Sequence, residues 1–103
     1  MTENKRHTER VPHPCEVVCT LLDGLAIANT RLSDLSTQGV FVESVNELPV
    51  GTVLRLGFQV GDHAIDVRGH VVQVMPQFGF GVRFDDLSPA GEAAISALVA
   101  QGS

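Results

Sequence analysis

Residues 53–60 read Val53-Leu54-Arg55-Leu56-Gly57-Phe58-Gln59-Val60, in which every second side chain from Leu54 onward is a large apolar one. Successive side chains of a β-strand point to opposite faces, so these four apolar side chains would share one face. Gly61-Asp62 follows directly and is typical of a hairpin turn. The stretch therefore predicts a half-buried strand that turns back into a neighbouring antiparallel strand.

Similar patterns extend in both directions from this hairpin. In residues 63–75 the apolar phase shifts near residues 69–72, which predicts a bulge or a bend there. Asp23-Gly24 is the strongest short hairpin signal in the chain and separates two further strand candidates. The predicted strands are residues 15–22, 25–32, 40–45, 53–60, 63–75 and 78–84.

The end of the chain has the features of a helix. Ser88 offers an N-cap hydroxyl, Pro89 suits the first helical position, and the alanine-rich stretch that follows carries an apolar stripe at helical spacing. We predict a helix over residues 88–100. Six short strands and one terminal helix predict an all-β domain, a small six-stranded antiparallel β-barrel over residues 15–100 with the helix against one opening or face.

The beginning of the chain differs from the rest. Residues 1–14 are polar, contain Pro12 and Pro14, and show no apolar periodicity. They predict a mobile basic arm, which carries Lys5, Arg6 and Arg10.

Composition narrows the classes of partner. The net charge is −5 and the seven Lys and Arg residues form no dense stripe, so we do not expect binding of long nucleic acid.

Cys15 and Cys19 would lie about 13 Å apart on one strand, too far for a disulfide. No apolar run approaches the roughly 20 residues of a membrane span, and the start of the chain is unlike a signal peptide. We expect a cytoplasmic protein that does not insert directly into the membrane.

One polar cluster, Asp34-Leu35-Ser36-Thr37-Gln38-Gly39, lies between the second and third predicted strands. Asp34 and Ser36 are two residues apart, so at a strand end their side chains would share one face. Gly39 permits a positive φ or a close backbone approach. A carboxylate accepts from the ring N–H and amino group of guanine, and an arginine suits phosphate oxygens and the O6/N7 edge of guanine. If the arm closes over this cluster, the pocket would suit an anion that contains guanine.

Two short motifs carry a family resemblance. Arg6-His7-Thr8-Glu9-Arg10 has the pattern R-x-x-x-R, and residues 34–39 have the pattern D/N-x-S-x-x-G. In this order, followed by a strand-rich chain that includes Gly79-Phe80-Gly81-Val82-Arg83-Phe84 and a closing helix, they resemble the PilZ domain. That domain is the bacterial receptor module for cyclic di-GMP, and the resemblance covers essentially the whole chain.

The resemblance implies a ligand-binding role for each matched residue. Arg6 and Arg10 would clasp guanine Hoogsteen edges, stack on purine planes and meet phosphates. Asp34 would accept from a guanine Watson–Crick edge, Ser36 would contact polar atoms of the ligand, and Gly39 would let the backbone approach. Lys5 and Arg83 are additional candidates, since both lie where they could reach the same surface.

The resemblance therefore implies a receptor for cyclic di-GMP. Its arm would change conformation on binding and signal to a downstream protein partner in motility, biofilm or polysaccharide control. The alternative is a protein-interaction adaptor with the same barrel that binds no nucleotide. In that case Asp34 and Ser36 would only satisfy backbone donors in a turn, the arginines of the arm would be a solvated tail, and Arg83 an ordinary exposed strand cation. Ligand stoichiometry, affinity and oligomeric state stay open, and Glu9 would compete with the ligand for Arg10.

An enzymatic role is not indicated. Ser36 lacks a G-x-S-x-G context, the histidines lack the paired spacing of a metal site, and no glycine-rich phosphate loop precedes a helix. We expect no catalysis, no bound metal, and no cofactor other than the ligand. Hydrolysis of a nucleotide is a distant third alternative.

Overall fold

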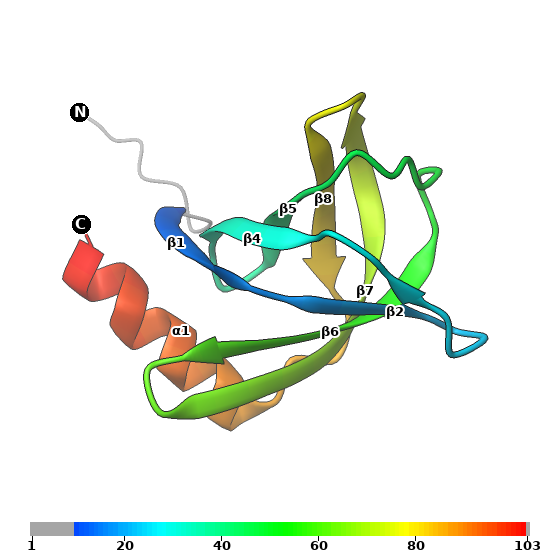
Figure 1. Cartoon of the computed structure of the whole chain (residues 1–103). Helices are drawn as coiled ribbons and strands as arrows, with labels where there is room; N and C mark the ends of the chain where they lie inside the picture. Colours follow the sequence, from blue (N-terminus) through cyan, green and yellow to red (C-terminus); the bar gives the residue numbers. More distant parts are fainter. Residues whose placement is uncertain (1–9, 103) are drawn as a thin grey trace.

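The computed structural model describes residues 10–102. They form one curled antiparallel sheet, followed by a helix at the C-terminal end of the chain (Figure 1). The elements are β1 (Val11–Glu16), β2 (Val18–Leu21), β3 (Ala26–Ile27), β4 (Arg31–Leu35), β5 (Gly39–Glu43), β6 (Val53–Val60), β7 (His63–Met75), β8 (Gly79–Phe84) and α1 (Pro89–Gly102). The strands lie in the order β1-β4-β5-β8-β7-β6-β2-β3. The predicted class, an antiparallel barrel-like sheet with one terminal helix, is confirmed.

The sheet has eight strand segments where the sequence predicts six strands. Two of the predicted strands are interrupted. Val17 separates β1 from β2, and its carbonyl accepts a hydrogen bond from the Thr30 hydroxyl at 3.0 Å. Asn29 has a positive φ of 59° and separates β3 from β4, because a left-handed residue cannot continue a strand.

The interruption at Val17 allows the sheet to curl. β1 pairs with β4 at one end of the sheet, while β2, directly after it in the chain, pairs with β6 at the other. One bent length of chain therefore belongs to both ends, as Figure 1 shows for the blue strand. This is how a short chain builds a barrel-like core.

β1 begins at Val11, which corrects the predicted boundary of the arm. Residues 11–14 are part of the sheet, although Pro12 and Pro14 indicated irregular structure. β1 is an edge strand, where a proline without an N–H is tolerated, and its pairing with β4 shifts register between Pro12 and Cys15. The prolines therefore distort this strand without preventing it.

The core follows the predicted alternation. The apolar side chains from Leu54 to Val60 are buried, as are those on the inner faces of the neighbouring strands. Leu32, Leu35, Val40, Val42, Val67, Val71, Phe80 and Val82 complete the centre. The predicted irregularity in β7 is confirmed as a register shift between Val71 and Gln73, and Val72, which lies within it, is exposed.

The helix caps this core. The Ser88 hydroxyl accepts from the Gly91 N–H at 3.0 Å, which confirms the predicted N-cap. Ile95 is fully buried, and α1 packs against β1, β6 and β7.

No helix within residues 10–102 is long and apolar enough to cross a bilayer. Cys15 and Cys19 are both free, and burial raises the pKa of the Cys19 thiol to about 11.

Candidate ligand-binding corner

The pairing of β1 with β4 places Arg10 beside Asp34, although 24 residues separate them in the chain. Val11 pairs with Leu35 and Pro12 with Asp34, so Arg10 reaches the end of β4 just as β1 begins. Arg10 Nη1 donates to Asp34 Oδ1 in an ion pair. We call Arg10, Asp34 and the turn of residues 36–39 the motif corner. The strand register thus joins the last residue of the first motif to the first residue of the second.

This ion pair is accessible from solvent. The Arg10 and Asp34 side chains are 47% and 38% exposed. An exposed pair of this kind stabilises the protein by about 0–1 kcal/mol, whereas a bidentate arginine–guanine contact is worth about 1–3 kcal/mol. The two side chains can therefore separate at little cost in stability.

Ser36 lies on the inside of the corner. Its side chain is only 2% exposed, and its hydroxyl accepts from the Gln38 and Gly39 N–H groups at 3.1 and 3.2 Å. β4 ends at Leu35, so the alternation of a strand does not extend to Ser36. The expectation that Asp34 and Ser36 share one face is wrong, because Ser36 is buried whereas the Asp34 side chain is 38% exposed. In this structure the hydroxyl of Ser36 shapes the turn and has almost no surface with which to meet a ligand.

Replacing Ser36 with alanine should destabilise the protein by about 1–3 kcal/mol, because the buried Gly39 N–H loses its acceptor. Chemical denaturation followed by circular dichroism measures this. Ser96→Ala is the matched control, because Ser96 is exposed on α1, where alanine favours the helix by a few tenths of a kcal/mol. Equal stability of the two variants would contradict a structural role for the Ser36 hydroxyl.

Gly39 starts β5 under the backbone of β8. A Cβ atom built on Gly39 would lie 2.2 Å from the Val82 carbonyl oxygen. The close backbone approach predicted at Gly39 is therefore present, but the neighbour is β8. Gly39 is buried, and its φ is outside the left-handed region.

Arg83 reaches the same corner from β8. Its Nη2 donates to Gln38 Oε1 at 2.9 Å, and the Phe84 N–H donates to the Gln38 carbonyl oxygen at 2.8 Å. Gln38 therefore ties the turn to β8. Gln38 was not among the predicted site residues, because it occupies an unspecified position of the motif. Only the register of Gly39 with Arg83 brings Gln38 and Arg83 together.

The structure thus brings together Arg10, Asp34, Ser36, Gly39 and Arg83, with Gln38 as the link. Lys5 and Arg6 lie outside the described residues, as does Glu9. Within residues 10–102, no three His, Cys, Asp or Glu side chains are grouped so that they could hold a metal ion. The corner offers an exposed arginine–carboxylate pair and, through the hydrogen bond to Gln38, a second exposed arginine. Such groups are the donors and acceptors that polar anions use in proteins.

Fold and corner together define a small β-barrel binding domain. The family model of the PilZ domain matches residues 4–101. The chain therefore belongs to the PilZ family, which is a family of cyclic di-GMP receptors whose domains bind ligands and partners rather than catalyse reactions.

A solved structure supports the fold. The chain is similar to the crystal structure of the PilZ domain of CeSA from a cellulose-synthesizing bacterium, with a TM-score of 0.65 and 19% sequence identity. The match covers 89% of this chain and 95% of that one. No curated protein matches the chain.

Proposed function

We propose that this protein is a cytoplasmic receptor for cyclic di-GMP that binds its ligand at the motif corner. The observation that carries the proposal is the Arg10–Asp34 ion pair, which joins the two family motifs at one accessible place. A guanine presents O6 and N7 acceptors to an arginine and N–H donors to a carboxylate. Arg10 and Asp34 match these two edges.

Binding would exchange the partners of this ion pair. Arg10, together with Arg6 in front of it, would turn to the Hoogsteen edge of a guanine and to phosphate oxygens, and Asp34 would accept from a Watson–Crick edge. Arg83 and Lys5 would supply further cations. Ser36 and Gly39 would act on the ligand through the shape of the turn, because both are buried.

The exchange also provides a signal. A ligand shifts a conformational equilibrium only by as much as it binds one state better than the other. Cyclic di-GMP would favour the state in which the segment before Arg10 lies against the barrel rim. A downstream protein partner would recognise that altered surface, with motility, biofilm formation or polysaccharide production as the outputs that family membership implies.

Isothermal titration calorimetry with cyclic di-GMP tests the proposal, with GTP and cyclic di-AMP as controls. We expect saturable heat with cyclic di-GMP. Cyclic di-AMP should bind at least about 10-fold more weakly, because adenine does not offer Asp34 adjacent N–H donors. Absence of both heat and a thermal shift at ligand concentrations well above micromolar would contradict the proposal and favour an adaptor that binds no nucleotide.

A further inference from the structure

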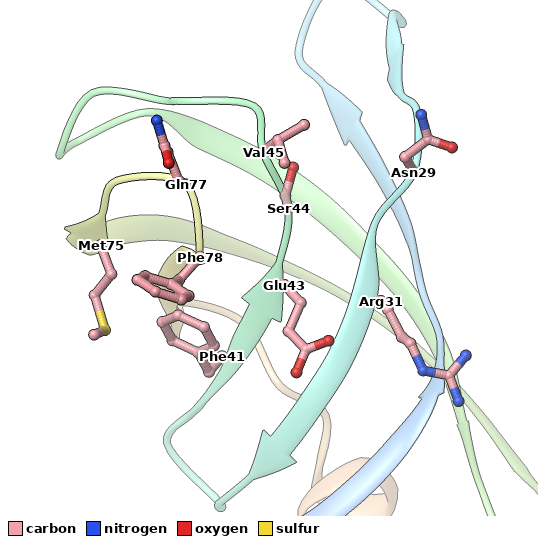
Figure 2. Close-up of a pocket in the computed structure, with 9 residues that line it drawn as sticks. All are labelled: Asn29, Arg31, Phe41, Glu43, Ser44, Val45, Met75, Gln77 and Phe78. Carbon is pink, nitrogen blue, oxygen red and sulfur yellow. The ribbon is translucent and has the colours of Figure 1, made fainter.

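A second concave site lies on the outer face of the sheet, beyond the motif corner. Its volume is about 560 Å³, and it lies between the start of β4, the end of β5 and the β7–β8 turn. Arg31, Phe41, Glu43, Met75 and Phe78 form most of its wall, and we call it the phenylalanine pocket. Figure 2 shows Met75, the two phenyl rings, Glu43 and Arg31 following one another across this face.

Local backbone geometry leaves the rings of Phe41 and Phe78 uncovered on one side of the pocket. Gln77 has a positive φ of 70° in the β7–β8 turn, and Phe78 after it is 69% exposed. Phe41 lies over Gly79, since a Cβ atom on Gly79 would be 2.9 Å from Cε2 of Phe41. The cross-strand partner of Phe41 on β8 is Gly81, which has no side chain to cover the ring. An exposed aromatic wall of this kind offers a planar ligand a stacking surface.

The two charged side chains of the pocket, Arg31 and Glu43, are free to bind a ligand. Arg31 and Glu43 are opposite each other in the β4–β5 register, yet neither side chain makes a hydrogen bond or an ion pair with any other residue in the described range 10–102. Both are exposed. Glu43 thus lies next to the two phenyl rings and Arg31 lies beyond Glu43, at the far end of the pocket (Figure 2), where they offer an acceptor for N–H donors and a donor for an anionic group.

The pocket adjoins the motif corner through one residue. Phe41 is the β4–β5 partner of Asp34, and the Ser33 hydroxyl lies 3.5 Å from the Phe41 carbonyl oxygen. Side chains directly opposite each other on one face of an antiparallel pair have Cβ atoms about 4.5–5.5 Å apart. A ligand held by Asp34 is therefore close to the base of the Phe41 side chain, whose ring extends from there over Gly79 on β8.

We infer that the phenylalanine pocket binds a guanine base of a nucleotide, as a second base subsite beside the motif corner. Phe41 and Phe78 would supply the stacking surface. Glu43 would accept from the ring N–H and the amino group, and Arg31 would meet a phosphate oxygen. Pockets of about 300–1,000 Å³ with an apolar lining and a few convergent polar groups are typical ligand sites. Adenine fits less well, because its Watson–Crick edge does not present two adjacent donors to a carboxylate.

The inference rests on the proposed function if the base belongs to the same cyclic di-GMP molecule, and stands apart from it if the base comes from a separate guanine nucleotide. Phe78→Ala and Glu43→Gln test it, with Leu22→Ala and Asp62→Asn as matched controls. Leu22 is 72% exposed on the β2–β3 hairpin, and Asp62 is exposed in the β6–β7 turn, so neither touches the pocket.

Calorimetry with cyclic di-GMP should show about 5- to 30-fold weaker binding for Phe78→Ala, because the base loses part of its stacking surface. Glu43→Gln should weaken binding about 10-fold and reduce the preference for cyclic di-GMP over its inosine analogue, which lacks the amino groups. The two controls should bind as the unaltered protein does. Pocket variants that bind and discriminate as the controls do, while Arg10→Ala still loses affinity, would overturn the assignment of the pocket to the second base of cyclic di-GMP and leave the proposed function intact; binding of a separate guanine nucleotide is then decided by GMP.

GMP is the probe that separates the two sources of the base. We expect GMP to shift the amide NMR signals of Phe41, Glu43 and Phe78, and to do so much less in Phe78→Ala. If cyclic di-GMP fills the pocket with its second base, prior saturation with cyclic di-GMP abolishes these shifts. If the pocket takes a separate nucleotide, the shifts persist.

Should the unaltered protein bind no cyclic di-GMP, the proposed function fails, and GMP shifts confined to the pocket still support the inference. No GMP shift in the pocket, with or without the messenger, overturns it.

Discussion

Arg10→Ala should weaken the binding of cyclic di-GMP by about 5- to 150-fold, the equivalent of one bidentate arginine–guanine contact. The loss should be close to the upper value if Arg10 also meets a phosphate. Stability should change little, because the ion pair with Asp34 is exposed and contributes at most about 1 kcal/mol. Calorimetry measures the affinity, and thermal unfolding without ligand measures the stability.

Arg55→Ala is the matched control. Arg55 Nη1 pairs with Asp66 Oδ1 at 3.0 Å on the β6–β7 hairpin, so this variant also removes one arginine from one exposed cross-strand ion pair. The overall change in net charge is the same in both variants. If Arg55→Ala lost as much affinity as Arg10→Ala, the effect would come from net charge, and the motif corner would not be the binding site.

Gly39→Ala should cause the largest loss of stability among simple substitutions at the corner. The new methyl group would lie 2.2 Å from the Val82 carbonyl oxygen, and a backbone atom inside a sheet cannot move aside without disturbing the β5–β8 pairing. Overpacking costs about 1–3 kcal/mol and occasionally more, and a fixed backbone neighbour favours the upper end of this range. Urea denaturation should therefore show a much lower midpoint, with little change in slope.

Gly57→Ala provides the comparison for this substitution. Gly57 also lies in a strand, but a Cβ atom there would meet nothing closer than the Ile65 carbonyl oxygen at 3.9 Å. Alanine at that position should be neutral or stabilise the protein by about 0.4–1 kcal/mol through the unfolded state. Equal midpoints for the two variants would mean that β5 and β8 do not approach each other at Gly39 as closely as described.

The regular part of the fold was predictable because the sequence is patterned there. The alternation in residues 53–60 predicted β6 and its buried face, and Ser88-Pro89 predicted the start of α1. The boundary of the arm was not predictable. Pro12 and Pro14 indicate irregular structure locally, and only the pairing of β1 with β4 shows that an edge strand accommodates them.

The arrangement of the candidate site was only partly predictable. The two motifs named Arg10 and Asp34, but the register of β1 with β4 is what brings them together. The burial of Ser36 was missed because the side-chain alternation of a strand was extended one residue past the end of β4. The role of Gln38 was missed for a different reason, since a cross-strand hydrogen bond to Arg83 leaves no local signal in the sequence.

The phenylalanine pocket shows the limit of local patterns most clearly. Nothing near Phe78 in the sequence distinguishes it from the inward phenylalanine at position 80 two residues later. The positive φ at Gln77 takes Phe78 out of the strand and leaves it exposed, and this depends on the geometry of the whole β7–β8 turn. Such a site is visible only when distant strands are assembled.

A crystal structure of the protein with cyclic di-GMP tests the central claim most directly. We predict a guanine whose Watson–Crick edge donates to the Asp34 carboxylate, with the Arg10 guanidinium turned from Asp34 onto the ligand. The messenger bound elsewhere on the barrel, with the Arg10–Asp34 ion pair left unchanged, would contradict it.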